Sequence, residues 1–374
     1  MKKLILFSML CAWVTVMNAQ NIYYVEPGGT GQGTSWSDAG DLGIALASVS
    51  SGDQIWAKHG TYQGIFVIQC AVELYGGFNG TENLLSDRIL DSNYTSIITT
   101  NHAISSAPSL DHALTDFGYD CTIDGFVIRG SGHGRLHGGA IYFHYANVVL
   151  RNILIVSNHA QCGAVELGHC TGRIENVIFK DNVAWDICAG LLLSNCSNMV
   201  LVNVLFDNND ASSSSGFDNP DWPQTDPYNG CRWIGALFAE NTVAELINCT
   251  FASSNKADLG SGIGCDSSTL HITNSIFDCV EFLRLGNPLL RPSFIHFEYC
   301  DTWQCTRNPT SWSLQYSHCM HNNPMFTPTF HLQPGSPCID AGDNNFLSGN
   351  VLLDLDLQPR IVGGAVDMGA YESQ

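Results

Sequence analysis

The sequence predicts an all-β fold, a parallel β-solenoid built from stacked copies of one short unit. Two motifs repeat with a period close to 25 residues, and no amphipathic helix pattern separates their copies. A unit of a few short strands cannot bury its apolar face alone, whereas stacked copies bury it against one another. The content of 45% hydrophobic and 13% charged residues also excludes a disordered chain.

The first motif is an Asn followed by three mostly apolar residues. A weaker copy starts at Gly125, and successive copies are 27, 24, 27, 45 and 26 residues apart. The long interval contains an insertion of about twenty residues, which such repeats tolerate in their loops. We assign the asparagines a structural role, because stacked turn amides can bond one another and Asn accepts a left-handed corner. The copies are NILI, NVIF, NVLF, NCTF and NSIF, starting at Asn152, Asn176, Asn203, Asn248 and Asn274.

The second motif runs in phase with the first and separates core residues from outward residues. Its copies are GAIYFH, GAVELG, AGLLLS and GALFAE, starting at Gly139, Gly163, Ala189 and Gly235. Strand alternation assigns to the core Ile141, Phe143, Val165, Leu167, Leu191, Leu193 and Leu237. Tyr142, His144, Glu166 and Glu240 then point outward, with Tyr142 next to Glu166. We expect the two carboxylates to be three rungs apart, about 14 Å, which is too far for a paired-carboxylate glycosidase.

Residues 1–19 have the pattern of a cleavable secretory signal, with Lys2 and Lys3 before an apolar run and cleavage near Ala19. No later segment offers eighteen uninterrupted apolar residues, so we expect no membrane span. The protein is therefore predicted to be secreted, periplasmic or at the cell surface. A net charge of −20 disfavours nucleic acid as a partner, and the composition specifies no oligomeric state.

The mature chain divides into three parts. Residues 20–94 are expected to form an N-terminal cap and the first rungs, with a short amphipathic capping helix over residues 38–49. Residues 95–318 form the β-helix, with the insertion at residues 211–230. Residues 319–374, rich in Pro and Gly, form a loop-rich C-terminal cap. Caps are expected because an open terminal rung exposes unpaired strand edges.

Fourteen cysteines follow the signal segment, an even number that permits disulfides in an exported chain without specifying any. Cys162 and Cys188 are 26 residues apart, as are Cys170 and Cys196, and both pairs hold matching positions in the repeat. We expect each pair to stack on adjacent rungs, as free thiols or as disulfides. Parallel Cβ atoms one strand spacing apart lie slightly too far from each other for an unstrained bond.

The two ends of the mature chain carry a family resemblance. They hold the opening segment from Ile22 to Tyr62, which begins IYYVEPGGTGQGTSW, and the segments FHLQPGSPCIDAG from Phe330 and DLDLQPRIVGGAVDMGAYES from Asp354. The chain resembles the right-handed parallel β-helix family of pectate-lyase-like proteins, in the form common among exported Bacteroidetes proteins. Its end resembles the C-terminal region called choice-of-anchor Q. The resemblance implies a right-handed β-helix, but not one activity, because members include lyases, hydrolases and adhesins.

The candidate catalytic residues gather at one outward face beside a basic loop, RGSGHGRLHGG, which contains Arg135 and His137. A β-helix lyase needs a base for the C5 proton of a uronate, a positive charge for its carboxylate and an acid for the leaving oxygen. We expect Arg135 or His144 to remove the proton, Tyr142 to assist the leaving oxygen, and Glu166 to orient a partner or a cation. The competing interpretation is a flexible corner with solvated histidines.

The insertion mixes aromatic and acidic side chains, a combination that suits pyranose rings, which are apolar on one face and polar at the edge. The competing interpretation is a surface loop pinned by prolines. Calcium is the one cofactor considered, but the spacing of Asp207, Asp210, Asp218 and Asp221 matches no known calcium loop, and no metal ligand is assigned. The candidate substrate-binding residues are His137, Glu240, Asp221, Trp222, Tyr228, Arg232 and Trp233.

Two functions from different classes are consistent with this pattern. The first is an exported β-helix protein that binds polysaccharide along an outer groove and cleaves it as a polysaccharide lyase or glycoside hydrolase. The alternative is a non-catalytic, adhesin-like scaffold at the surface. The sequence contains no P-loop, HExxH or GxSxG motif, which disfavours nucleotide, zinc-protease and α/β-hydrolase chemistry.

Overall fold

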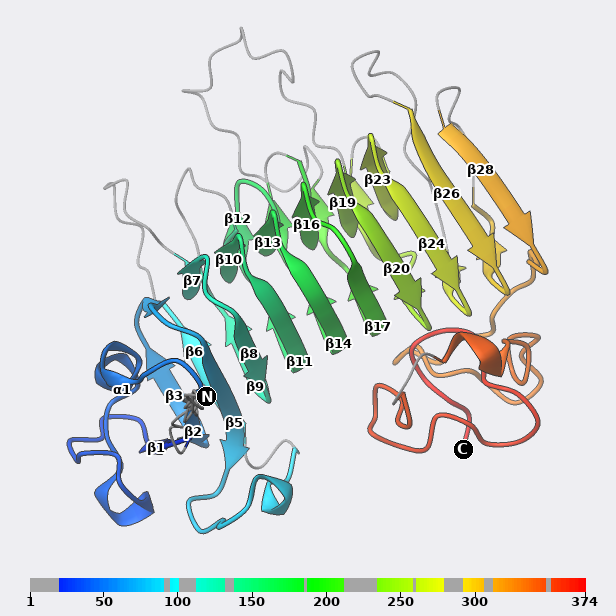
Figure 1. Cartoon of the computed structure of the whole chain (residues 1–374). Helices are drawn as coiled ribbons and strands as arrows, with labels where there is room; N and C mark the ends of the chain where they lie inside the picture. The colour runs from blue at the N-terminus through cyan, green and yellow to red at the C-terminus, as the bar shows by residue number, and fades with distance from the viewer. Residues whose placement is uncertain are drawn as a thin grey trace, which may run out of the picture.

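The computed structural model describes residues 20–90, 95–100, 112–131, 138–184, 187–211, 234–257, 260–278, 292–305, 312–347 and 351–374. Within these ranges the chain forms a parallel β-helix, in which strands stack rung upon rung along one axis (Figure 1). The segment NILI pairs in parallel with NVIF, with Ile153 opposite Val177. The all-β prediction is therefore confirmed. The expected signal, residues 1–19, lies outside the described residues.

Three parallel sheets form the walls of the helix. The seven-stranded sheet contains β4 (Phe66–Ile68), β7 (Leu114–Phe117), β10 (Ile141–His144), β13 (Val165–Gly168), β16 (Leu191–Ser194), β19 (Leu237–Glu240) and β23 (Ile263–Asp266). The four-stranded sheet contains β12 (His159–Ala160), β15 (Val183–Ala184), β18 (Asp210–Ala211) and β22 (Lys256–Ala257). The large sheet contains β1 (Ile22–Val25), β2 (Asp53–Lys58), β3 (Gly60–Gln63), β5 (Val72–Phe78), β6 (Ser96–Thr99), β8 (Cys121–Asp124), β9 (Phe126–Arg129), β11 (Asn147–Val156), β14 (Thr171–Lys180), β17 (Met199–Asp207), β20 (Val243–Ile247), β21 (Thr250–Phe251), β24 (Thr269–Thr273), β25 (Ile276–Asp278), β26 (Ser293–Glu298), β27 (Asp301–Trp303) and β28 (Trp312–Ser317).

The repeated Asn residues bend the large sheet, as their structural assignment predicts. Asn152, Asn176 and Asn203 lie inside β11, β14 and β17, and each has a left-handed backbone with φ between 52° and 54°. Asn176 Nδ2 donates to Asn152 Oδ1 at 3.2 Å, and Asn203 Nδ2 donates to Asn176 Oδ1 at 2.9 Å. Amides that bond along the axis fix this corner from rung to rung.

A second Asn ladder, which the sequence analysis did not identify, lies at the next corner. Asn158 Nδ2 donates to Asn182 Oδ1 at 3.0 Å, and Asn182 Nδ2 to Asn209 Oδ1 at 2.9 Å. Asn209 continues the chain to Asn255 at 3.0 Å. The same amides donate to backbone carbonyl groups, such as that of Ile128. The signal for this ladder is a short pattern, an Asn two residues before an Ala, in SNHA, DNVA, NNDA and SNKA.

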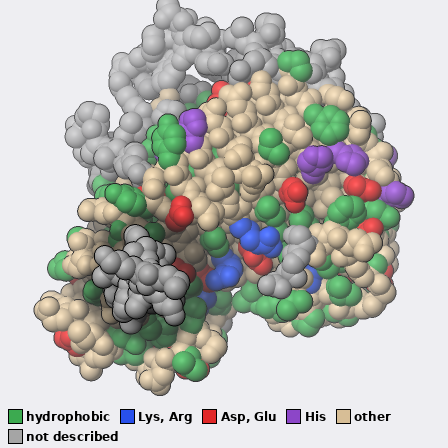
Figure 2. All heavy atoms as spheres, in the orientation of Figure 1, with side chains coloured by type: hydrophobic (Ala, Val, Ile, Leu, Met, Phe, Trp, Pro, Cys, Tyr) green, Lys and Arg blue, Asp and Glu red, His purple; other side chains and the backbone are tan. Residues whose placement is uncertain are grey.

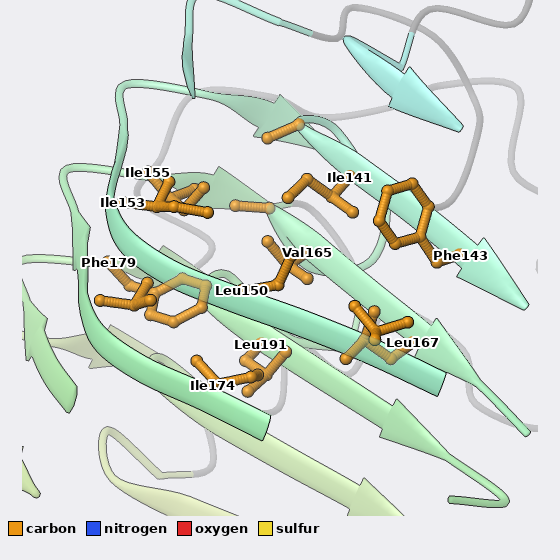
Figure 3. Packing of buried hydrophobic residues seen from close by; sticks show 14 of the residues in the cluster. Ile141, Phe143, Leu150, Ile153, Ile155, Val165, Leu167, Ile174, Phe179 and Leu191 are labelled. Carbon is orange, nitrogen blue, oxygen red and sulfur yellow. The ribbon is translucent and has the colours of Figure 1, made fainter. Parts of the chain in front are cut away.

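The core follows the predicted alternation. Every side chain assigned to it from the second motif is fully buried, and several of them point into the interior between the sheets (Figure 3). Phenyl rings also stack along the axis, with centroids 4.9 Å apart for Phe179 and Phe206 and 4.5 Å apart for Phe251 and Phe277. Each rung thus buries its apolar side chains against those of the next rung.

The cysteine register is confirmed. The pair Val165–Leu191 aligns Cys162 with Cys188, and the pair Gly168–Ser194 aligns Cys170 with Cys196. All four cysteines are buried and carry thiols rather than disulfide bonds. Cys196 Sγ donates to Leu167 O at 3.2 Å, and Thr242 Oγ1 makes the same bond to Leu193 O one rung later. These thiols therefore act as buried hydroxyl equivalents, and burial raises the pKa of Cys196 to about 12.

The predicted N-terminal helix is present but shorter than expected. Helix α1 covers Leu42–Ser48, and Asp41 caps it by accepting hydrogen bonds from the Gly43 and Ile44 N–H groups. Leu42 and Leu46 are buried in the core of the first rungs. No helix in the described ranges is long and apolar enough to cross a membrane.

The C-terminal tail lies along the side of the solenoid. Asn203 Nδ2 donates to Leu353 O at 2.8 Å, Asn248 Nδ2 to Asp367 O at 2.9 Å, and Asn274 Nδ2 to Asp343 O at 3.0 Å. In Figure 1 the tail accordingly lies beside the ends of β17, β20 and β24. We had expected the tail to close the end of the solenoid. It also packs on the side of the solenoid, where it binds the Asn corner of several rungs.

Candidate functional site

Four of the predicted site residues lie on the outward side of the seven-stranded sheet, as expected. Tyr142 on β10 pairs with Glu166 on β13, and His144 pairs with Gly168. Glu240 on β19 pairs with Ser194 on β16. The expected spacing of three rungs between Glu166 and Glu240 is wrong, because only β16 lies between their strands. Two rungs and an offset of two residues separate their backbones by about 12 Å.

His144 and Glu166 form the centre of the site. The His144 Nε2 atom lies 3.5 Å from Glu166 Oε1, and the two side chains are 20% and 7% exposed. Gly168 makes this contact possible, since a Cβ atom at that position would overlap the imidazole ring. This distance is long for a hydrogen bond. The Glu166 carboxylate nevertheless lies where it would stabilise a protonated His144 ring.

Tyr142 completes the cluster. Its ring lies 4.4 Å from the His144 ring and stacks on the His112 ring at 4.8 Å, with an interplanar angle of 13°. Burial, then the Glu166 carboxylate and then Tyr145, raise the pKa of Tyr142. The phenol is therefore held in its protonated, proton-donating form. His112 was not predicted as a site residue, because its only signal in the sequence is its position just before the strand of the preceding rung.

The rest of this outward face is partly closed. Leu192 and Phe238, which follow Glu166 in the same column, are each 3% exposed. Glu240 accepts a hydrogen bond from Ser194 Oγ at 3.2 Å and has Asp266 on the next rung. In the described part of the sheet, no outward position holds Arg or Lys.

The other predicted site residues lie outside the described part of the chain: Arg135, His137, Asp221, Trp222, Tyr228, Arg232 and Trp233. Across the described ranges, no group of three His, Cys, Asp or Glu side chains is arranged to hold a metal ion. Two acidic residues of the C-terminal tail, Asp354 and Asp367, accept hydrogen bonds from backbone N–H groups of the tail, including those of Gln358 and Ser373.

A hollow lies over the large sheet, between the N-terminal rungs and the tail (Figure 2). It has a volume of about 550 Å³, and its floor is the in-register column Val127, Leu154 and Ile178. Arg88 and Arg151, near its edge, both bind the buried Asp124 carboxylate, at 3.0 and 2.8 Å. This charge pairing makes the hollow a poorer candidate for acid–base chemistry than the Tyr142 cluster.

The comparisons with known proteins agree with the fold. No protein-family model matches the chain, and no curated protein matches it. Among solved structures, the chain is similar to the crystal structure of pectate lyase Pel9A, with a TM-score of 0.50 and 14% identity over 96% of this chain and 97% of that one. This likeness confirms a pectate-lyase-like parallel β-helix. The resemblance of the tail to choice-of-anchor Q stays a prediction.

Proposed function

We propose that this protein binds polysaccharide at the outward face of the seven-stranded sheet and cleaves it by elimination. The contact between His144 and Glu166, with Tyr142 against the imidazole, is the observation that carries the proposal. This contact brings together a base, a carboxylate partner and a protonated phenol from two adjacent rungs. An outward sheet face gains little from such a set unless a ligand meets it.

The proposed chemistry assigns one step to each group. His144 takes the C5 proton of a uronate residue, and Glu166 stabilises the resulting imidazolium. The electrons of the C5–H bond form the C4–C5 double bond, and the C4–O bond breaks. Tyr142, whose raised pKa keeps the phenol protonated at neutral pH, gives its proton to the leaving glycosidic oxygen. Arg135, considered from the sequence as an alternative base, is assigned here to neutralise the uronate carboxylate.

A non-catalytic scaffold is the second candidate function. The burial of Leu192 and Phe238 favours it, because a sheet face that is closed over two rungs leaves less room for a long glycan. The two candidates differ in whether turnover occurs. A binding scaffold holds glycan unchanged, whereas the elimination proposal requires a new double bond in the product.

The purified protein should be screened against polyuronates and neutral glycans, with binding measured by calorimetry. Elimination is read from the ultraviolet absorbance of the unsaturated product, and hydrolysis from new reducing ends without that absorbance. We expect elimination with a polyuronate, and its loss in His144→Ala with binding retained. Absence of both binding and turnover for every glycan would reject the proposal, and binding without turnover would support the scaffold.

A further inference from the structure

A row of corner residues borders the candidate site on one side. Six strands of the seven-stranded sheet, from β7 to β23, are each followed by a residue with positive φ, and strand pairing places these residues in line on successive rungs. Their φ values run from 46° to 97°. The row consists of Gly118, Tyr145, His169, Asn195, Asn241 and Ser267.

Tyr145 is the exception in this row. Gly and Asn adopt the left-handed conformation readily, whereas an aromatic residue in it is an outlier. Tyr145 has φ 63° and its side chain is 67% exposed. The chain thus accepts an unfavourable backbone and an exposed aromatic ring at one corner, and burial does not offset either. A strained residue without a folding benefit points to function.

Among the described residues, one face of the Tyr145 ring is stacked and the other faces the corner residue of the preceding rung. On one side Tyr145 stacks on His169, with ring centroids 4.6 Å apart and planes 9° apart. On the other side the preceding corner is Gly118, where an added Cβ would meet only Tyr145 backbone and Cβ atoms, at 3.9 and 4.0 Å. The missing side chain therefore leaves a notch one rung high beside an aromatic face.

A matched pair elsewhere shows what this stack does when it serves the fold. Tyr299 and His318 are also left-handed corner residues, with φ 51° and 54°, and their rings stack at 4.6 Å and 14°. There the tail packs against the pair, with the Phe346 ring 6.0 Å from Tyr299. The same stack is thus partly buried at one corner and exposed at the other.

We propose that Tyr145 is a sugar-binding platform, on which a pyranose ring stacks in the notch above Gly118. The apolar face of a pyranose suits an aromatic face, and its hydroxyl groups remain at the solvent-exposed edge. The Tyr145 ring lies 6.1 Å from the His144 ring, so this subsite adjoins the proposed chemistry. The inference rests on the proposed function and adds to it a subsite outside the catalytic cluster.

Three variants test this platform with the best glycan from the screen. Tyr145→Asn installs the residue found at the equivalent corners of later rungs, so it removes the ring without straining the backbone. We expect its Kd to rise about tenfold, with thermal stability equal to or above that of the wild type. Tyr145→Phe should keep wild-type affinity. Tyr299→Asn, the matched control, should keep affinity and lose stability.

Three results would overturn the inference. Wild-type affinity in a folded Tyr145→Asn protein would show that the ring does not bind sugar, while the proposed function would stand. Equal loss of affinity in Tyr145→Phe and Tyr145→Asn would assign the effect to the hydroxyl group and reject stacking. A wild-type protein that binds no glycan would reject both the subsite and the proposed function.

Discussion

The flank that carries the C-terminal tail and the outward face of the seven-stranded sheet use the same repeat differently. Under the tail, outward polar groups bond to tail backbone, as when Thr250 Oγ1 accepts from Ala370 N at 2.9 Å. On the seven-stranded face, side chains contact side chains of the next rung, as in His144 and Glu166. The first arrangement stabilises the fold. The second leaves reactive groups together, so changes at the two places should affect different properties.

The largest expected effect comes from the buried charge in the tail. Arg360 is 1% exposed and donates to the carbonyl groups of Ala370, Asp367 and Gly369. Arg360→Ala leaves these acceptors unpaired and should lower the free energy of unfolding by about 3 to 5 kcal/mol, measured by urea denaturation. Lys58→Ala, at the more exposed ion pair of Lys58 with Glu26, should cost less than about 1 kcal/mol. Equal costs would contradict the contrast between buried and surface charge.

The pH dependence of the tail is the next effect. Burial raises the pKa of Glu372 to about 7, despite nearby Arg360. Because the folded pKa is raised, the associated stability is complete below the unfolded value of about 4.3 and is lost as pH rises through about 7. Asp301, raised by burial to about 6, acts in the same direction. Urea midpoints should fall between pH 5 and pH 8, and Glu372→Gln should reduce that fall.

A smaller effect is expected where the tail meets the Asn corner. Asn248→Gly keeps the left-handed backbone, which has φ 54°, and removes the amide that donates to Asp367 O. The free energy of unfolding should fall by about 1 to 2 kcal/mol. Asn241→Gly, at an exposed corner of the other row, should change it by less than about 0.5 kcal/mol. If both variants lost the same stability, the Asn248 amide would not be a specific anchor for the tail.

Repeats determined how much of the fold could be predicted. The phase of the two motifs gave the parallel pairing, the core parity and the cysteine register, since each depends only on the periodicity of the rungs. The 46-residue interval between Ala189 and Gly235 was harder to interpret. It spans one rung, because β16 and β19 pair directly with each other. The error in the spacing of Glu166 and Glu240 concerns this interval.

Other features depend on contacts between residues that are far apart in the sequence, which no local pattern predicts. The position of the tail depends on amide groups that already have a role in the corner, as at Asn203. Burial of Leu192 could not be predicted, because alternation assigns a direction and not what covers it. Tyr145 was missed because its left-handed backbone and the Gly118 notch appear only when neighbouring rungs are aligned.

The most direct test of the account is the double variant Tyr142→Phe and Glu166→Gln, measured for glycan binding, turnover and thermal unfolding. Both substitutions keep side-chain size, so the free energy of unfolding should stay within about 1 kcal/mol of the wild type. Turnover of a polyuronate should be lost, because the acid and the imidazolium partner are both removed. Unchanged binding and turnover in a well-folded double variant would contradict the assignment of this face as the functional site.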